Sequence, residues 1–174
     1  MSLKDHRYII FGAPGSGKST LIKQLAEPSN CIAFDLETVG GKEIYTQAEH
    51  LQIEKKKRTQ ELDRLLSFDF DRPLFIGAAD IDPYKYKELK IILLHIPHRQ
   101  SYLNWIEKRN ILQPEKRDQA NEHMHQICSD RAAEKKYTYL IDPSNFADRP
   151  DLMAAHVWHL IDPDNALRPR NNIS

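Results

Sequence analysis

A chain of 174 residues, of which 40% are hydrophobic and 29% charged, is long enough to bury one core without disulfides or a structural metal. Its 25 basic and 25 acidic side chains cancel, so no overall field attracts the protein to nucleic acid or to an anionic membrane. We therefore expect neither partner, and any phosphate binding must come from a local site. The sequence leaves open whether the protein is a monomer or a homodimer.

The cysteines and the N-terminal region indicate the compartment. Cys31 and Cys128 show no metal-ligand spacing, and a core of this size needs no disulfide. This usage favours a reducing environment. The first apolar run, Tyr8 to Phe11, is too short for the core of a signal peptide or for a membrane span. We expect a cytoplasmic protein.

Short apolar runs alternate along the chain with longer amphipathic ones, a pattern typical of a parallel sheet covered by helices. Strands are expected at Tyr8–Phe11, Cys31–Asp35, Leu74–Ala79, Lys90–Ile96 and Thr138–Ile141. Helices are expected at Ser19–Ala26, Glu43–Leu66, Ser101–Arg109, Asp118–Lys136 and Pro150–Leu160, with a loop at Asn110–Arg117. The fold class is thus α/β, a three-layer domain over residues 1–163 with a five-stranded parallel sheet, followed by a flexible tail at 164–174.

Parallel strands connected by right-handed crossovers bind ligands beyond their carboxyl ends. This rule places several polar segments on one edge of the expected sheet. They are residues 12–19, 35–37, 77–80 and the loop after Ile141. The candidate chemistry is concentrated there.

The clearest signal in the sequence is a phosphate-binding loop between the first strand and the first helix. Its pattern is G-x-x-x-x-G-K-[ST], formed by Gly12, Ala13, Pro14, Gly15, Ser16, Gly17, Lys18 and Ser19, with Thr20 next. The glycines let successive backbone N–H groups turn toward phosphate oxygens, and the helix adds its positive N-terminus. We expect Lys18 to reach the outer phosphates and the Ser19 hydroxyl to bind Mg²⁺. This motif, between a strand and a helix, predicts a nucleoside triphosphate and magnesium as cofactors.

Such a loop alone does not separate kinases, GTPases and motor ATPases. The chain has no N-K-x-D guanine-reading motif, which favours ATP over GTP. It also lacks the transporter-ATPase signature and the length of a helicase core. A small kinase or a small ATPase-like domain remains.

From Arg7 to about Leu160 the chain resembles the adenylate-kinase-like group of small-molecule kinases, nearest in pattern to shikimate and gluconate kinases. The resemblance rests first on the phosphate loop and then on Phe34-Asp35-Leu36-Glu37, which is similar to the D-x-D of shikimate kinases. It implies a P-loop NTPase fold in which Asp35 orders the magnesium shell and Glu37 faces the acceptor hydroxyl. A carboxylate exposed at a strand end is the alternative for either residue.

The segment from Leu74 to Asp80, an apolar strand that ends in an acid, resembles a Walker B element. The resemblance implies that Asp80 holds Mg²⁺ through water, although capping of the next turn is an equal alternative. Shikimate kinases carry a glycine triplet here to seat their substrate. This chain has Gly77-Ala78-Ala79 instead, which argues against shikimate itself.

Kinases of this group close an arginine-bearing lid over the transferring phosphate. The resemblance implies a short lid at about residues 109–120, with Arg117 as the lid arginine and Arg109 as a contact to the base or the phosphates. It further suggests that Arg131 grips an anionic acceptor, and that Pro143 and Ser144 pack against adenine. Solvated surface positions are the alternative for the arginines.

The function that these observations predict is an ATP-dependent phosphotransferase acting on a small metabolite such as a sugar acid, nucleoside or nucleotide. Two alternatives stay open at this point. One is a P-loop ATP-binding or ATPase module that switches a protein partner without a small acceptor. The other is an interaction protein whose charged helix, Glu43–Leu66, docks a partner while the nucleotide is structural.

Overall fold

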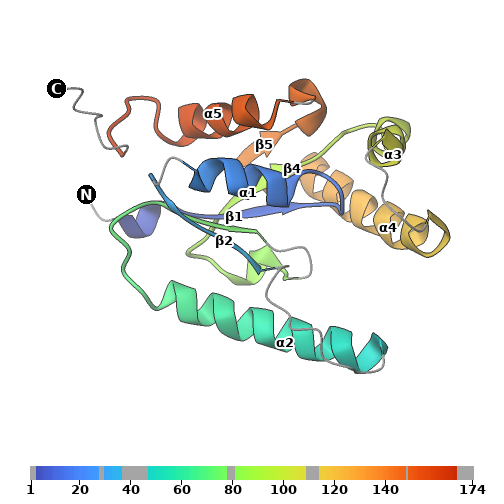
Figure 1. Ribbon diagram of the computed structural model, residues 1–174, viewed down its shortest axis with the longest axis horizontal. Coiled ribbons are helices and arrows are strands. Elements are labelled where there is room, and N and C mark those ends of the chain that lie inside the picture. Colours follow the sequence, from blue (N-terminus) through green and yellow to red (C-terminus); the bar gives the residue numbers. More distant parts are fainter. Residues whose placement is uncertain are drawn as a thin grey trace.

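Five parallel strands form the centre of the protein, in the order β2-β3-β1-β4-β5 (Figure 1). In the computed structural model these are β1 (Arg7–Gly12), β2 (Ile32–Asp35), β3 (Leu74–Gly77), β4 (Lys90–Leu94) and β5 (Tyr139–Ile141). The helices are α1 (Lys18–Ala26), α2 (Gln47–Leu66), α3 (Arg99–Lys108), α4 (Pro114–Ala133) and α5 (Pro150–Ile161). The structure describes residues 3–27, 30–36, 47–77, 81–108, 114–147 and 149–167, with the backbone alone at 47–55, 108 and 114–121.

The two faces of the sheet bury alternate residues of each strand, as a pleated strand covered on both sides requires. In β1, Ile9 and Phe11 pack in a core with residues of α2, α3 and α4. Tyr8 and Ile10 point the other way, into a second core with residues of α1 and α5. Figure 1 shows α1 and α5 above the sheet and α2 below it. The expected three-layer α/β architecture with a five-stranded parallel sheet is confirmed.

A buried guanidinium fixes α2 against the central strand. Arg7 is 7% exposed, and it donates hydrogen bonds to the carbonyl oxygens of Leu66 at 3.0 Å and Phe68 at 2.7 Å. A cation is favourable at this end of a helix, where carbonyl groups lack intrahelical partners. Arg7 therefore connects the start of β1 to the end of α2.

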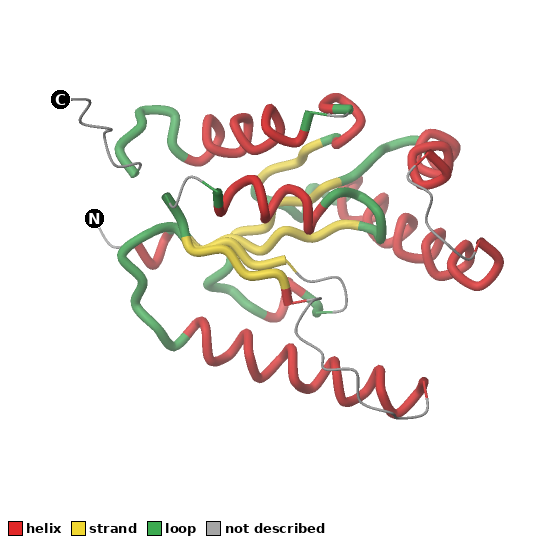
Figure 2. The backbone as a smooth tube through the Cα atoms, in the orientation of Figure 1, coloured by secondary structure: helices red, strands yellow, loops and turns green. Residues whose placement is uncertain are grey.

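The strand register brings the carboxyl ends of the strands to one edge. Gly12 of β1 pairs with Leu94 of β4, and Leu94 pairs in turn with Ile141 of β5. On the other side of β1, Gly77 of β3 pairs with Asp35 of β2. The β1–α1 loop and the β4–α3 connection emerge at this same end (Figure 2). The described parts of the segments expected on one edge therefore lie there.

Most element boundaries agree with expectation, but the loop predicted at Asn110–Arg117 is wrong from Pro114 onward. Pro114 is the first residue of α4. Proline is well tolerated there because its missing N–H would have no partner in the first helical turn. Residues 114–120, predicted as part of a lid, are thus helical. Among the helices that the structure describes, none is long and apolar enough to cross a membrane.

The first residues of the predicted tail have a specific partner. Asp162, which ends α5 and is 3% exposed, accepts hydrogen bonds from the backbone amides of Ala166 at 2.8 Å and Leu167 at 3.2 Å. Buried carboxylates require such donors. The remaining tail, 168–174, lies outside the described residues.

Close packing at the carboxyl edge yields a test of the fold. A Cβ on Gly77 would lie 2.0 Å from Cδ1 of Ile22 in α1. We expect Gly77→Ala to lower the free energy of unfolding by about 1–3 kcal/mol through overpacking. Ile22→Val alone should lower it by about 0.5–1.5 kcal/mol. Because Ile22→Val removes the clashing methyl group, the double variant should lose less than the sum in urea denaturation. Simple additivity would contradict this packing.

Candidate nucleotide-binding site

The loop between β1 and α1 opens with a tight turn whose residues match its geometry. The Ser16 amide donates to the Ala13 carbonyl at 3.1 Å, and Gly15 has φ 76°. With Pro14 before a positive-φ glycine, this is a type II turn. Gly17 follows with φ 97° and ψ 17° and caps α1. Glycine is needed at both positive-φ positions because a side chain would be strained there.

Gly12 is required for a different reason, namely close approach of the neighbouring strand. A Cβ at this position would lie 2.8 Å from the Leu94 carbonyl oxygen and 2.7 Å from Ser16 Oγ. The first of these atoms belongs to the backbone of β4 and cannot move aside cheaply. The glycine therefore lets the loop curl directly against the sheet edge.

Lys18 lies inside this curl rather than in solvent. It is 5% exposed, and its ammonium donates to the carbonyl oxygens of Gly12 at 2.9 Å and Ala13 at 3.2 Å. A buried charge is tolerated only when polar groups surround it. The loop thus holds one positive charge among its own backbone groups, beside the start of α1.

The start of α1 is open to an anion. Its N-cap, Gly17, provides no side-chain hydrogen bond to the first turn, so the positive end of the helix is not neutralised by a capping side chain. Ser19 and Thr20 in that turn are exposed. Ser16 Oγ is buried and has no hydrogen-bond partner within the described part of the chain. These groups fit a polyphosphate and its divalent cation.

Two aromatic residues of α3 support the loop from outside, and we did not predict this role from the sequence. Tyr102 donates its hydroxyl proton to the Pro14 carbonyl at 2.7 Å, and the Trp105 indole N–H donates to the Gly15 carbonyl at 2.9 Å. The sequence offered a signal: these aromatics are three positions apart on the helix that follows a buried strand. This spacing indicates a contact with the phosphate loop only once the strand order is known, because β4, which precedes the helix, lies next to β1, which precedes the loop.

Cys128 of α4 contacts the loop as well. Its side chain is fully buried and belongs to the same core cluster as Ala13. Burial raises the pKa of this thiol to about 11, while Lys18 and the Ala13 amide act in the opposite direction. Cys128 is therefore a neutral thiol at physiological pH and serves as packing behind the loop.

Of the predicted acids, Asp35 is the one that the structure describes. It ends β2 and is half-buried, and its Oδ1 lies 3.9 Å from the position that a Cβ on Gly77 would take. The carboxylate is therefore at the edge of the sheet, two strands from the phosphate loop. Glu37 and Asp80 lie outside the described residues.

The loop after β5 begins with a 3-10 turn, Pro143–Phe146. Pro143 is buried, and the Ser144 hydroxyl donates to Asp142 Oδ1 at 2.6 Å. Asp142 also accepts from the Ser144 amide at 2.9 Å, as a capping aspartate does. The predicted adenine contact by these two residues stays a prediction.

The predicted arginines occupy different situations. Arg109 lies outside the described residues, and Arg117 is on α4 where only the backbone is described. The Arg131 guanidinium lies 4.4 Å from the centre of the Tyr84 ring, a cation–π contact. The expected roles of Arg117 as the lid arginine, of Arg109 as a contact to the base or the phosphates, and of Arg131 as a grip on an anionic acceptor stay predictions.

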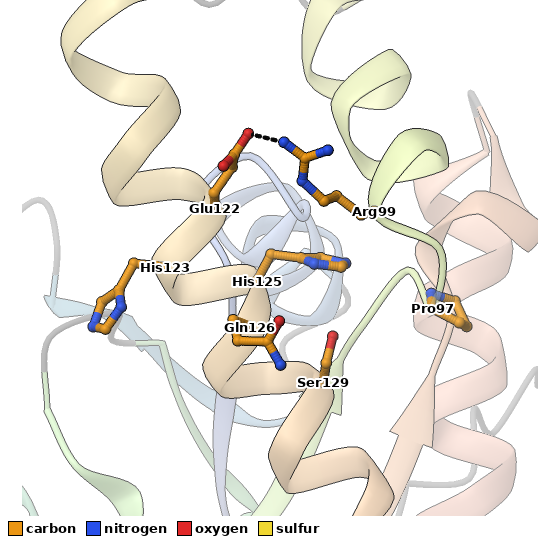
Figure 3. A pocket seen from close by; sticks show the side chains of 7 residues that line it. All are labelled: Pro97, Arg99, Glu122, His123, His125, Gln126 and Ser129. Carbon is orange, nitrogen blue, oxygen red and sulfur yellow. Dashed lines mark hydrogen bonds and ion pairs between the residues drawn. The ribbon is translucent and has the colours of Figure 1, made fainter.

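A cavity of about 530 Å³ lies between the β4–α3 connection and α4 (Figure 3). It is lined by Pro97, Arg99, Glu122, His123, His125, Gln126 and Ser129. Its guanidinium and carboxylate form an ion pair with each other, so neither charge is uncompensated. Within the described ranges, no cluster of three or more His, Cys, Asp or Glu side chains could hold a metal ion. This is compatible with Mg²⁺, which usually takes one or two protein groups together with substrate phosphates and water.

His125 lines this cavity and also contacts Tyr102, one of the two aromatic residues that support the phosphate loop. Its ring stacks on Tyr102 with centroids 4.7 Å apart and an interplanar angle of 14°, and its Nε2 donates to the Ile96 carbonyl at 2.8 Å. The His95 ring also lies against that of His125, with their centroids 5.0 Å apart. Burial, and then the neighbouring His125, lower the pKa of His95. The stack is therefore built from buried, hydrogen-bonded rings.

Comparison with solved structures identifies the architecture. Shikimate kinase from Acinetobacter baumannii, solved in complex with shikimate, matches with a TM-score of 0.64 over 92% of this chain and 94% of that one, at 19% sequence identity. Shikimate kinase from Bacteroides thetaiotaomicron matches with a TM-score of 0.62 over 90% and 98%, at 17% identity. A sugar kinase from Janibacter sp. HTCC2649 matches with a TM-score of 0.59 over 94% and 98%, at 12% identity. The chain has a P-loop kinase fold.

Comparison of the sequence alone finds less. A scan against protein-family models matches residues 8–72, from β1 to just beyond α2, to the viral superfamily 1 RNA helicase core domain. No significant match was found among curated proteins. The partial match includes the phosphate loop and covers less than half of the chain. The likeness to kinases is therefore one of fold.

Both cysteines are free and buried, which gives a chemical test of this packing. Burial raises the pKa of the Cys31 thiol, like that of Cys128, to about 11. Because the thiolate is the reactive species, we expect neither thiol of the folded protein to react rapidly with a thiol-specific disulfide reagent at about pH 8. Both should react in urea. Rapid reaction of one thiol in the folded protein would show that the packing around it is wrong.

Proposed function

We propose that this protein is an ATP-dependent phosphotransferase that acts on a hydroxyl or phosphate group of a small metabolite. The observation that carries the proposal is the loop at residues 12–19, where Lys18 lies among backbone carbonyls beside an α-helix whose N-terminus has no side-chain cap. Phosphoryl transfer depends on positioning and on neutralising charge, and these are the properties that such a loop supplies.

The fold of shikimate and sugar kinases supports the same class of reaction. In our proposal, Lys18 holds the outer phosphates, and the hydroxyl of Ser19 and the carboxylates of Asp35 and Asp80 hold Mg²⁺, the acids through water. The metal, when bound, neutralises charge on the transferring group. Glu37 orients the acceptor hydroxyl.

The remaining predicted residues bind and enclose the nucleotide. Arg117 neutralises charge on the transferring phosphate, Arg109 contacts the base or the phosphates, and Pro143 and Ser144 pack against adenine. Enclosure of the site would exclude water and so limit idle hydrolysis of ATP. The acceptor is a small molecule, for example a sugar acid, nucleoside or nucleotide. The two free cysteines support a reducing compartment such as the cytoplasm.

A second candidate is a P-loop ATPase module that acts on a partner and has no small acceptor. The match of residues 8–72, which include the phosphate loop, to an RNA helicase core domain favours it, because a helicase acts on a macromolecule and not on a small acceptor. The two candidates differ in what stimulates ADP release. A small acceptor should do so in the first case, and a macromolecular partner in the second.

The acceptor can be sought directly. We expect ADP release from Mg-ATP to rise at least ten-fold when one compound from a panel of sugar acids, nucleosides and nucleotides is added, with a phosphorylated product detectable by mass spectrometry. If ADP release is indifferent to every compound but responds to a protein or nucleic-acid partner, the second candidate replaces the first.

Lys18→Ala tests the role of the ammonium. Because charge-assisted hydrogen bonds contribute about 1.5–3 kcal/mol, we expect the affinity for Mg-ATP to fall about ten-fold or more in calorimetric titration. Lys23→Ala is the matched control, since Lys23 is an exposed lysine on the same helix. Unchanged binding by the Lys18 variant, in a protein that remains folded by circular dichroism, contradicts the proposal.

A further inference from the structure

Two side chains outside the phosphate loop bind two consecutive residues of it. Tyr102 donates to the Pro14 carbonyl, and Trp105 donates to the Gly15 carbonyl. We call Tyr102 and Trp105 the loop clamp. Both come from α3, which covers the face of the sheet opposite α1.

The clamp acts on the peptide unit that defines the turn. Type I and type II turns differ by a flip of the central peptide, here the one joining Pro14 and Gly15. The C=O and N–H of a trans peptide point in opposite directions. With its carbonyl held by the Tyr102 hydroxyl on the α3 side, this peptide directs the Gly15 N–H away from α3. The bond from Trp105 to the Gly15 carbonyl restrains the next peptide, whose N–H, that of Ser16, closes the turn by donating to the Ala13 carbonyl at 3.1 Å.

The donors themselves are held firmly. Tyr102 is 1% exposed, and its ring stacks on His125, whose Nε2 donates to the Ile96 carbonyl at 2.8 Å. Figure 3 shows His125 extending from α4 toward the connection that carries Pro97 and Arg99. Tyrosine and tryptophan also have few rotatable bonds, so little entropy is lost when they donate. The hydroxyl of Tyr102 is therefore fixed in place before any ligand arrives.

We infer that Tyr102 and Trp105 are positioning residues for nucleotide binding: they hold the turn in the orientation that directs the Gly15 N–H away from α3, toward the phosphates, while the Ser16 N–H stays in the turn's own hydrogen bond to Ala13. The inference rests on the proposed function, since it presumes that the loop binds a nucleotide. Preorganised amides need no reorganisation when the ligand binds, so removing either donor weakens the nucleotide complex. Trp105 also becomes a reporter, because its indole nitrogen lies 2.9 Å from the loop.

Two conservative variants test the positioning role by affinity. Tyr102→Phe and Trp105→Phe each remove one donor and keep an aromatic ring. We expect each to raise the Kd for Mg-ATP about five-fold, as the loss of one net hydrogen bond predicts. Tyr84→Phe is the matched control: its hydroxyl donates to the Lys136 carbonyl at 2.7 Å, away from the loop. It should lower thermal stability similarly and leave the Kd unchanged.

Fluorescence gives a second, independent readout. The other tryptophan, Trp158, packs edge-on against Phe75 at 5.7 Å in the core on the opposite face. Adding Mg-ATP should therefore change the emission of Trp158→Phe, which retains Trp105, and should leave that of Trp105→Phe unchanged. This measurement needs only Trp158→Phe to fold, so it shows whether Trp105 senses the bound nucleotide even if Trp105→Phe does not fold.

The outcomes separate the two proposals. If the wild-type protein binds no nucleotide, the proposed function fails. If the wild type binds Mg-ATP but Tyr102→Phe and Trp105→Phe lose thermal stability without any change in Kd, the two residues are structural only and the positioning role is overturned. An emission change that persists in Trp105→Phe and vanishes in Trp158→Phe also overturns it.

Discussion

The bonds from the Lys18 ammonium to the carbonyl oxygens of Gly12 and Ala13 are the interaction on which the rest of the site depends. They fold the loop back over the end of β1 and keep a positive charge beside the start of α1. A Cβ on Gly12 would lie 2.8 Å from the Leu94 carbonyl oxygen of β4, so only glycine lets the loop curl against the sheet edge here. The buried ammonium of Lys18 thus connects the phosphate loop, the end of β1 and the start of α1.

The loop is also constrained from its outer side. Tyr102 and Trp105 of α3 donate hydrogen bonds to the carbonyl groups of Pro14 and Gly15, so the loop lies between its own lysine and a helix of the opposite layer. This arrangement follows from the strand order, because β4 lies next to β1 and its following helix stands beside the loop. A loop held on both sides loses less conformational entropy when it binds a ligand.

The sequence predicted the sheet, its parallel strands and the phosphate loop, because these depend on local signals: buried apolar runs, positive-φ glycines and a lysine before the helix. The helix expected at Ser101–Arg109 is confirmed as far as the described residues go, to Lys108, although α3 begins at Arg99. The start of α4 at Pro114 was missed because proline reads as a helix breaker unless the first turn is recognised.

What the sequence could not predict is contact between distant elements. Tyr102 and Trp105 looked like ordinary residues of an amphipathic helix, and their hydrogen bonds to the loop span 88 and 90 positions. Cys128, one of several apolar residues in a largely polar helix, gave no local sign that it packs in the same core as Ala13. Such contacts follow from strand order and helix placement, which periodicity alone does not specify.

The most direct test of this account is calorimetric titration of the intact protein with ATP in the presence of magnesium. We predict saturable heat at one site per chain, with affinity that falls sharply when magnesium is removed. Absence of heat with both Mg-ATP and Mg-GTP, together with an unchanged melting temperature at saturating nucleotide, would contradict the central claim that residues 12–19 bind a polyphosphate.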